Sequence, residues 1–309
     1  MVRTLCLIDR APASPDRSMA APGLPHLRYM KNTVTPFSLA IDPLRISAIE
    51  AARAAGDLIR RAAAAPGALQ MREKKPNDFV TEVDLASEQA IVAALLAQYP
   101  AHGVRTEESA QTYGHPDARH VWIVDPLDGT TNFIHGYPNY AVSIALAIDG
   151  RIDHGVVLDV CSGDVFHASR GQGAWCNAAP IRVSDGRGLA AAVLASSCPA
   201  RAALAPHRAI ALLTEVMGRV AAIRRSGSAA LDMARVAAGQ CDGAFDQGLQ
   251  AWDVAAGSLL ITEAGGQIGN FLGGADYLES REYMAAGPGL FSELGALLCA
   301  YSRFATPPV

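Results

Sequence analysis

Two aspartates close the apolar stretch Trp122–Phe133, which reads WIVDPLDGTTNF. Asp125 follows the apolar residues directly, and Asp128 comes three positions later. If the run before them is a strand, Pro126 prevents further ladder pairing and the turn brings the two carboxylates together. Such carboxylates raise each other's pKa unless a cation lies between them, and oxygen donors suit Mg²⁺ or Mn²⁺. The stretch predicts a cation site, with an Asx-type turn that only caps the backbone as the alternative.

The turn after these aspartates suits an anion. Gly129 lets the backbone approach a ligand closely. The N–H groups of Gly129, Thr130 and Thr131 could open a short helix, whose N-terminus attracts negative charge. A cation on one side and a phosphate on the other is the chemistry that these residues favour.

Further acidic positions could complete such a site. Glu107 and Glu108 precede the predicted strand, although an isolated pair of this kind is usually a solvated loop. Asp253 opens a predicted helix and could be an ordinary N-cap. Asp84 lies three residues after Thr81, the spacing of a capping box. Capping and metal binding are compatible, because the helix dipole helps to keep an N-terminal carboxylate ionised.

The first half of the chain contains the elements that must position these residues. Helical spacing of apolar residues predicts helices over 43–65, before Pro66 and Gly67, and over 83–99, before Pro100. Short β-branched runs bounded by Gly, Pro and Asp then predict a largely antiparallel sheet. Its predicted strands cover 120–126, 140–149 and 151–160, followed by a hairpin over 163–177.

The second half alternates helices with a strand, which is typical of an α/β arrangement. The predicted helices cover 204–220, 228–240 and 253–263, and the predicted strand covers 242–247. Gly186-x-Gly188-x-x-Ala191 weakly matches a dinucleotide fingerprint. We interpret it as a linker, because it follows a turn and lacks an acidic partner on a second strand.

Composition excludes several classes of function. The 309 residues are half hydrophobic, which suits one large domain or two closely packed ones. The net charge of −4, without runs of like charge, argues against direct binding of nucleic acid or of an anionic membrane. No apolar stretch approaches the ~20 residues of a membrane span.

The cysteines and the N-terminal segment bear on the compartment. The six cysteines are scattered, without a Cys-x-x-Cys pair, so the sequence indicates neither a zinc site nor a disulfide framework. Reduced thiols of this kind favour a cytoplasmic protein. Residues 1–40 are rich in Pro, Ala and Arg and lack a secretory pattern, so we expect a disordered extension there.

Five strings, taken in order, resemble the inositol monophosphatase family, and most closely its bacterial inositol-1-monophosphatases. They read NDFVTEVD, TEES, WIVDPLDGTTNFIHG, RRSGSAALDMARVAAG and WDVAAGSLLITEAGG. The resemblance covers residues 43–291. It implies a layered αβαβα sandwich of the inositol monophosphatase and fructose-1,6-bisphosphatase type. Residues 41–185 would form an α+β half with most metal ligands, and 186–309 an α/β half that completes the active site.

The same resemblance implies roles for individual residues. The implied metal ligands are Glu107, Asp125, the carbonyl of Leu127, Asp128 and Asp253. Thr130 would pair with Asp84 and, together with Glu107, orient the attacking water. The implied substrate-binding residues are Asp128, Gly129, Thr130, Gly227, Ala229, Asp246 and Asp253. Asp246 stands where many relatives carry glutamate, which leaves the identity and orientation of the alcohol open.

The implied activity is hydrolysis of inositol 1-phosphate and similar small polyol monophosphates. Two or three Mg²⁺ ions, with Mn²⁺ as a substitute, would activate the water for in-line attack without a covalent phosphoenzyme. Histidinol-phosphate phosphatase and fructose-1,6-bisphosphatase remain alternatives. A 3′-phosphoadenosine phosphatase is disfavoured, because it usually carries Gly-Thr-Lys-Glu where this chain has Gly-Thr-Thr-Asn.

The family also sets expectations that no motif carries. We expect a homodimer and lithium sensitivity. A role as a binding partner of the transcription machinery is the non-enzymatic alternative. Near the site, Asp78 could be a supporting carboxylate, Lys74 either a phosphate contact or a solvated lysine, and His135 an ordinary loop histidine.

Overall fold

The computed structural model describes residues 42–65, 71–75, 78–109, 112–184, 186–197 and 206–305. Ile41–Val309 forms one compact unit. The predicted extension over 1–40 lies outside the described residues, so its disorder stays a prediction. The predicted division of the compact unit after residue 185 also stays a prediction.

The larger sheet has eight strands in the order β10-β9-β8-β7-β6-β5-β3-β4. They are β3 (Gly103–Thr106), β4 (Tyr113–Gly114), β5 (His120–Asp128), β6 (Ala141–Ile148), β7 (Arg151–Asp159), β8 (Val165–Ser169), β9 (Ala174–Cys176) and β10 (Ala179–Ile181). Neighbouring strands are antiparallel except β3 and β5. The predicted antiparallel sheet and the hairpin over 163–177 are confirmed.

The smaller sheet has five strands in the order β12-β11-β13-β15-β14. They are β11 (Val193–Ala195), β12 (Ala222–Arg224), β13 (Gly243–Gln247), β14 (Gln267–Gly269) and β15 (Glu282–Ala286). Pairing is parallel from β12 to β13 and antiparallel from β13 to β14. Two further strands, β1 (Met71–Lys75) and β2 (Asp78–Thr81), form a separate hairpin.

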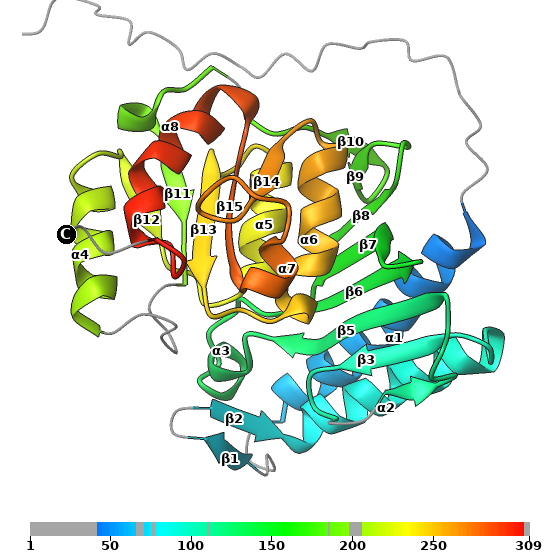
Figure 1. The fold of residues 1–309 in the computed structure, drawn as a ribbon. Coiled ribbons are helices and arrows are strands. Elements are labelled where there is room, and N and C mark those ends of the chain that lie inside the picture. Colours follow the sequence, from blue (N-terminus) through cyan, green and yellow to red (C-terminus); the bar gives the residue numbers. More distant parts are fainter. Residues whose placement is uncertain are drawn as a thin grey trace, which may run out of the picture. The chain divides into compact units, whose positions relative to one another are not determined.

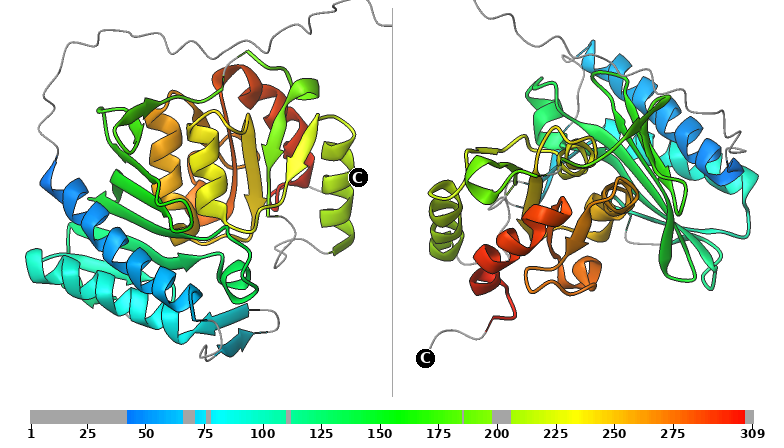
Figure 2. Two further views of the ribbon diagram at one scale, coloured as in Figure 1. Left: turned by 180° about the vertical axis from the view of Figure 1, so that it is seen from behind. Right: turned by 90° about the horizontal axis from the view of Figure 1, so that it is seen from above.

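Helices α1 (Pro43–Ala63) and α2 (Glu82–Gln98) pack on one face of the larger sheet, as Figure 2 shows. Asp42 begins α1 by accepting a hydrogen bond from Leu44 N at 2.9 Å, with Pro43 in the first turn. The buried stripe of α1 meets Trp122, Val124 and other side chains from the same face of the sheet. Burial of these apolar side chains from water holds this layer together.

Helices α5 (Ala229–Ala237) and α6 (Ala251–Glu263) lie between the two sheets (Figure 1). Ile123 and Ala145 of the larger sheet and Ala244 of the smaller one pack into the same apolar cluster as these helices. Strands β5 and β6 therefore carry apolar residues on both faces, because helices cover both.

Helices α4 (Pro206–Met217) and α8 (Pro288–Leu298) cover the far face of the smaller sheet, against Leu194, Phe245 and Met284. Helix α7 (Tyr277–Ser280) and the 3₁₀ turns Leu189–Ala191 and Cys299–Tyr301 are short connections. The order of layers is helix, sheet, helix, sheet, helix, so the predicted αβαβα sandwich is confirmed. Among the described residues no helix is long and apolar enough to cross a membrane.

Three local predictions need correction. Strand β5 does not end at Pro126: pairing with β6 resumes at Asp128 after an irregular register that begins at Asp125. Helix α6 begins at Ala251 with Gln250 as N-cap, so Asp253 occupies the third helical position and is not the N-cap. Helix α8 and the short strands, which carry too little periodicity over two to five residues, were also not predicted; these strands are β1, β2, β3, β4, β10, β11, β12, β14 and β15.

Candidate active site

Strand β5 delivers Asp125 into the interior at the point where its pairing becomes irregular. Asp125 opposes Ser143, and Asp128 opposes Ala141, so the segment between them bulges out of the regular ladder. Leu127 N donates to Asp125 Oδ1 at 3.0 Å. The buried Pro126 contributes no N–H, and its carbonyl accepts from Ser87 Oγ at 2.8 Å. Strand alternation puts Asp125 on the same inner face as Ile123, and the hydrogen bonds of Leu127 N and Pro126 O keep these backbone groups of the bulge paired.

The short helix α3 (Thr130–Ile134) begins immediately after this bulge, as predicted. Its N-cap Gly129 has a φ of 96°, in the left-handed region where glycine is favoured. A Cβ at this position would lie 3.0 Å from Asn139 O and 3.2 Å from Gly227 O. Glycine therefore permits both the conformation and the close approach of the loop that contains Gly227.

Glu107 is held beside β5 through its backbone. Glu107 N donates to Val124 O at 3.2 Å. The next residue, Glu108, donates its N–H to the buried carboxylate of Glu88 at 3.1 Å, and Ser109 Oγ also bonds to Glu88. Glu88 on α2 thus fixes the acidic loop against the sheet, a role that its sequence position did not indicate.

Asp253 reaches the same place from the smaller-sheet side, on the first turn of α6. Its Oδ2 accepts from Gln250 N at 2.7 Å, which makes a capping box. Ser143 Oγ donates to Trp252 O at 3.1 Å and ties this turn to β6, directly opposite Asp125. These contacts fix the first turn of α6, and with it the position of the Asp253 carboxylate.

Glu107, Asp125 and Asp253 form one cluster, with an oxygen from each within 4.8 Å of the others. Burial, followed by the charges of Glu107, Asp128 and Asp253, raises the pKa of Asp125 well above its usual range. Burial and the charges of Glu107 and Asp128 do the same to the pKa of Asp253. Carboxylates held together in this way strongly favour a bound cation. A donor set made only of carboxylate oxygens fits a hard divalent ion such as Mg²⁺ or Mn²⁺.

Thr130 and Asp84 are brought together as predicted. Thr130 Oγ1 lies 2.9 Å from Asp84 Oδ1 and 3.1 Å from Leu127 O. Asp84 is fully buried, and its Oδ2 accepts from Thr81 N at 2.8 Å within the predicted capping box. Burial raises the pKa of Asp84, although the hydrogen bonds from Thr81 and Thr130 partly offset the shift.

Asp128 lies beside the three-carboxylate cluster and faces the N-terminus of α5. Its Oδ2 accepts from Ser228 Oγ at 2.5 Å and from Ala230 N at 2.8 Å. Burial raises the pKa of Asp128, and these helix N-terminal donors lower it in part. One carboxylate oxygen of Asp128 thus links the end of β5 to the start of α5.

The predicted Gly227 belongs to a loop with a polar frame. Gly227 is exposed, with a φ of 83°, and a Cβ there would lie 2.8 Å from Asn132 Nδ2. The carbonyl of Ser226 accepts from Asn132 Nδ2 at 2.8 Å and from Asn139 Nδ2 at 3.0 Å. The side chains of Asn132 and Asn139 therefore hold this loop next to Gly129.

Behind the loop lies Asp232, which is 1% exposed. Ser226 Oγ donates to Asp232 Oδ1 at 2.5 Å. Burial raises the pKa of Asp232 to about 7, against the lowering effects of Ser226 and Arg235. A carboxyl that titrates near neutral pH therefore supports the loop that contains Gly227.

Asp246 is 1% exposed on β13 and is already engaged. Ser197 N lies 2.9 Å from both of its carboxylate oxygens, and Ser196 Oγ lies 3.3 Å from Oδ1. Of the remaining predicted residues, Ala229 is buried at the start of α5 and His135 is exposed. The side chains of Lys74 and Asp78 lie outside what the structure describes.

Sequence comparison decides the family. A family model described as the inositol monophosphatase family matches residues 40–305. The chain belongs to the inositol monophosphatase family. The resemblance drawn from the five strings is confirmed, and with it the membership of a group of metal-dependent phosphatases.

Individual relatives of this inositol monophosphatase family member cover nearly the whole folded chain. "Nus factor SuhB" from Pseudomonas aeruginosa is 43% identical over 257 residues, 82% of this chain and 95% of that relative. "Nus factor SuhB" from Escherichia coli K12 is 44% identical, over 80% of this chain and 92% of that relative.

Solved structures agree with the fold of the family. The extragenic suppressor protein suhB from Bartonella henselae matches with a TM-score of 0.77 and 39% identity, over 82% of this chain and 97% of that one. Inositol monophosphatase from Anabaena matches with a TM-score of 0.71 and 31% identity, over 82% of this chain and 94% of that one.

Several supporting residues of this family member were not predicted from sequence. They are Glu88, Asn132, Asn139, Ser228 and Asp232. Ser228 could have been found, because a serine just before an apolar-periodic segment is an N-cap signal. The other four make hydrogen bonds to partners six to more than ninety residues away, which sequence spacing alone does not reveal.

Proposed function

We propose that this protein is a Mg²⁺-dependent phosphatase that hydrolyses inositol 1-phosphate and similar small polyol monophosphates. The observation that carries the proposal is the Glu107, Asp125 and Asp253 cluster, whose oxygens lie within 4.8 Å of one another. It adjoins Gly129 and Thr130, which begin α3 with backbone N–H groups not yet used within the helix. Carboxylate oxygens that could bind a cation and N–H groups that could bind a phosphate therefore occupy neighbouring positions.

Glu107, Asp125 and Asp253, with Asp128 and the carbonyl of Leu127, would hold the metal. When bound, Mg²⁺ would supply positive charge beside the ester and lower the pKa of a water molecule. The N–H groups of residues 129 and 130 would orient the phosphate by hydrogen bonding.

Thr130 and Glu107 would orient the attacking water for in-line displacement. Thr130 Oγ1 lies 2.9 Å from the buried Asp84 carboxylate, which fixes the direction of its hydroxyl. Because Asp84 accepts three hydrogen bonds from Thr81 and Thr130, its position is set before substrate binds. No nucleophilic side chain is needed for this reaction.

A polyol is the substrate class that the surroundings of the phosphate position favour. Asp128, Gly227, Ala229 and Asp246 offer carboxylate and backbone groups suited to hydroxyls. Asp246 accepts a hydrogen bond from Ser197 N at 2.9 Å, so the segment directly after β11 fixes the direction of its carboxylate before a substrate binds. We infer a site that accepts more than one small alcohol group.

The test is phosphate release from five esters, each with Mg²⁺ and with EDTA. The panel is inositol 1-phosphate, histidinol phosphate, fructose 1,6-bisphosphate, 3′-phosphoadenosine 5′-phosphate and β-glycerophosphate. We expect the highest kcat/KM for inositol 1-phosphate and no release with EDTA. The Asp125→Asn variant should be inactive, whereas Asp164→Asn, in the turn between β7 and β8 and outside the carboxylate cluster, should keep wild-type activity. Preference for another ester would change the substrate, and Mg²⁺-independent release would refute the mechanism.

A second candidate function is binding to the transcription machinery. It is favoured by the relatives named Nus factor SuhB, which are 43–44% identical to this chain. Co-elution of the wild type and Asp125→Asn with the host's purified RNA polymerase and elongation factors tests this. Failure of both proteins to co-elute would remove the candidate.

We further propose the finer properties that the family carries. They are a homodimer, lithium sensitivity and a cytoplasmic location. Equilibrium sedimentation tests the first, and LiCl inhibition of phosphate release at fixed Mg²⁺ tests the second. Fractionation of host cells tests the third.

A further inference from the structure

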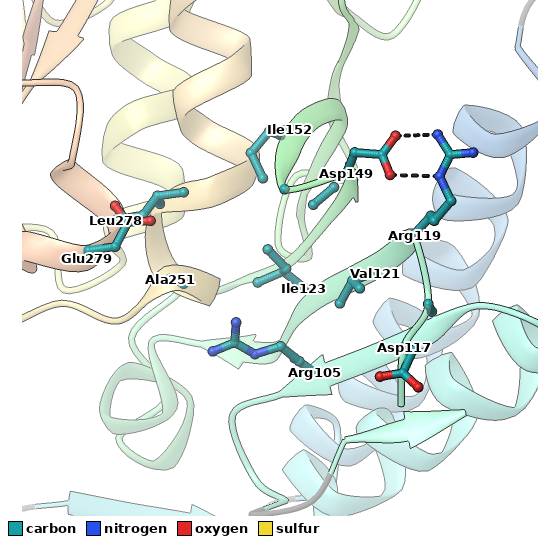
Figure 3. A pocket seen from close by; sticks show the side chains of 13 residues that line it. Arg105, Asp117, Arg119, Val121, Ile123, Asp149, Ile152, Ala251, Leu278 and Glu279 are labelled. Carbon is teal, nitrogen blue, oxygen red and sulfur yellow. Dashed lines mark hydrogen bonds and ion pairs between the residues drawn. The ribbon is translucent and has the colours of Figure 1, made fainter. Parts of the chain in front are cut away.

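A groove of about 590 Å³ lies on the inner face of the larger sheet (Figure 3). It exists because α6 packs chiefly over β6 and β7 and leaves the inner face of β3 and the first half of β5 uncovered. Its volume is in the range of small-molecule sites, which are about 300–1,000 Å³. The candidate catalytic residues do not line it.

The floor of this groove is apolar. Val121 and Ile123 from β5 and Ile152 from β7 contribute to it, and Leu278 of α7 closes one end. Ile123 and Ile152 are 7% and 6% exposed, so these side chains keep a small part of their surface open to the groove. An apolar ligand segment lying there would remove that surface from water.

Arg105 is the polar feature at the centre. It opposes Ile123 in the β3–β5 register, so its side chain lies on the same inner face. Figure 3 shows it between an end formed by Asp117, Arg119 and Asp149 and an end formed by Leu278 and Glu279. The side chain of Arg105 is exposed and makes no hydrogen bond or ion pair within the described part of the chain, whereas its backbone belongs to the β3–β5 ladder.

The other arginine in the groove is differently placed. Arg119 Nε donates to Asp149 Oδ1 at 2.7 Å, and its second nitrogen pairs with Asp149 Oδ2 at 2.5 Å. This two-point pair neutralises both charges. Arg105 is thus the cation in the groove that remains able to take an anion from outside.

We propose that this groove is a second ligand site, for an amphipathic monoanion. The anionic group would pair with the planar guanidinium of Arg105, and the apolar body would lie over Val121, Ile123 and Leu278. A ligand with a second anionic group at its far end is disfavoured, because Asp117 and Glu279 place negative charge at the two ends. A neutral ligand of the same length would lack the ion pair.

A ligand in this groove would contact β3 and α6, the elements next to Glu107 and Asp253, without entering the active site. Arg105 lies two residues before Glu107 on the chain, and Ala251, which also lines the groove, lies two residues before Asp253. The proposed site is independent of the proposed phosphatase activity. It is therefore tested without substrate and without metal, so that failure of one proposal leaves the other intact.

The experiment uses 8-anilinonaphthalene-1-sulfonate, an aromatic monosulfonate, as a fluorescent probe of the full chain in EDTA. Octanoate, octanedioate and 1-octanol are the competitors. We expect one saturable site per chain, displaced by octanoate at least tenfold more effectively than by octanedioate or octanol. Binding should also weaken as salt rises from about 50 to 500 mM.

Variants locate the site. Arg105→Gln should raise the dissociation constant of the probe about tenfold, and Leu278→Ser should raise it at least threefold. Arg61→Gln removes the same charge from exposed α1, on the other side of the sheet, and should leave binding unchanged. Arg105→Lys keeps the charge without the fork and should fall between the wild type and Arg105→Gln.

Three results would overturn the proposal. They are wild-type affinity in Arg105→Gln, equal displacement by octanoate and octanol, and several weak probe sites per chain that no variant alters. Circular dichroism and thermal unfolding of each variant separate loss of the site from loss of the fold.

Discussion

Replacing Asp125 by Asn should stabilise the metal-free protein while removing its response to Mg²⁺. The amide keeps the size of the side chain and can still accept the 3.0 Å hydrogen bond from Leu127 N. It removes one of three carboxylates whose oxygens lie within 4.8 Å of each other. At an effective dielectric constant of about 20, two unit charges at that separation repel by roughly 3.5 kcal/mol.

Protonation limits how much of this repulsion appears as stability. The pKa of Asp125 is raised well above its usual range, by burial first and then by Glu107, Asp128 and Asp253. A carboxyl that stays protonated at pH 7 costs the native state at most about 4 kcal/mol, the free energy of holding a proton three units above its unfolded pKa. We therefore expect Asp125→Asn to raise the free energy of unfolding in EDTA by about 1–4 kcal/mol at pH 7.

The sign of the pH dependence follows from the raised pKa. Because the native pKa of Asp125 is raised, the native state binds this proton more tightly than the unfolded chain does, so wild-type stability falls as pH rises above the unfolded pKa of about 4. The advantage of Asp125→Asn should vanish near pH 4 and grow toward pH 7. Mg²⁺ should reverse the ranking, because a ligand at about 100 times its dissociation constant stabilises the wild type by about 2.7 kcal/mol.

Urea unfolding at pH 4, 5.5 and 7, in EDTA and across a Mg²⁺ titration, measures all of these quantities. The control is Asp242→Asn. Asp242 is 3% exposed and accepts from Val193 N at 2.8 Å and from Ser184 Oγ, so losing its charge should destabilise by about 1–3 kcal/mol and leave the Mg²⁺ response intact. An Asp125→Asn protein less stable than wild type in EDTA, or stabilised equally by Mg²⁺, would refute the reasoning.

Three further predictions concern the supports of the site. The pKa of Asp232 is raised to about 7, so its effect should lower wild-type stability by at most about 4 kcal/mol between pH 4 and pH 7. Asp232→Asn should remove this fall. Identical dependence of the urea midpoint on pH in the two proteins would contradict this. Ser228→Ala should cost about 1 kcal/mol and lower kcat, since Ser228 caps α5 and donates to Asp128 at 2.5 Å; Ser228→Thr should restore both in unfolding and phosphate-release assays. Gly129→Ala should destabilise by about 1–3 kcal/mol, because φ is 96° and the Cβ would lie 3.0 Å from Asn139 O; thermal unfolding that matches wild type would show that the loop adapts.

The sequence by itself determined much of this protein. The helical spacing over 43–65 and 83–99 and the β-branched runs over 120–160 predicted α1, α2 and the antiparallel strands, because one buried face imposes a period on the chain. The motif from Asp125 to Thr131 also predicted a helix start at Gly129 and a convergence of carboxylates. Local order along a strand and a turn is enough to place residues that lie within a few positions of each other.

Strand continuity through Pro126 could not be inferred from local rules. The loss of one N–H predicted an end to pairing, whereas the register recovers at Asp128 because β6 offers a partner on the other side of the bulge. Helix α6 begins two residues before its predicted start at Asp253 for a similar reason. Gln250 and Asp253 cap each other, and Ser143 fixes the turn from another strand.

Only the tertiary structure decided which carboxylates share a cation site and which serve as supports. Glu107, Asp125 and Asp253 come from three elements, yet their oxygens lie within 4.8 Å, while Asp128 uses an oxygen on α5 and Asp246 is bound to Ser197. The groove around Arg105 also depends on how far α6 extends across the sheet. Distances between elements are set by packing of whole faces, and a one-dimensional pattern carries the identity of each face but not the position of its partner.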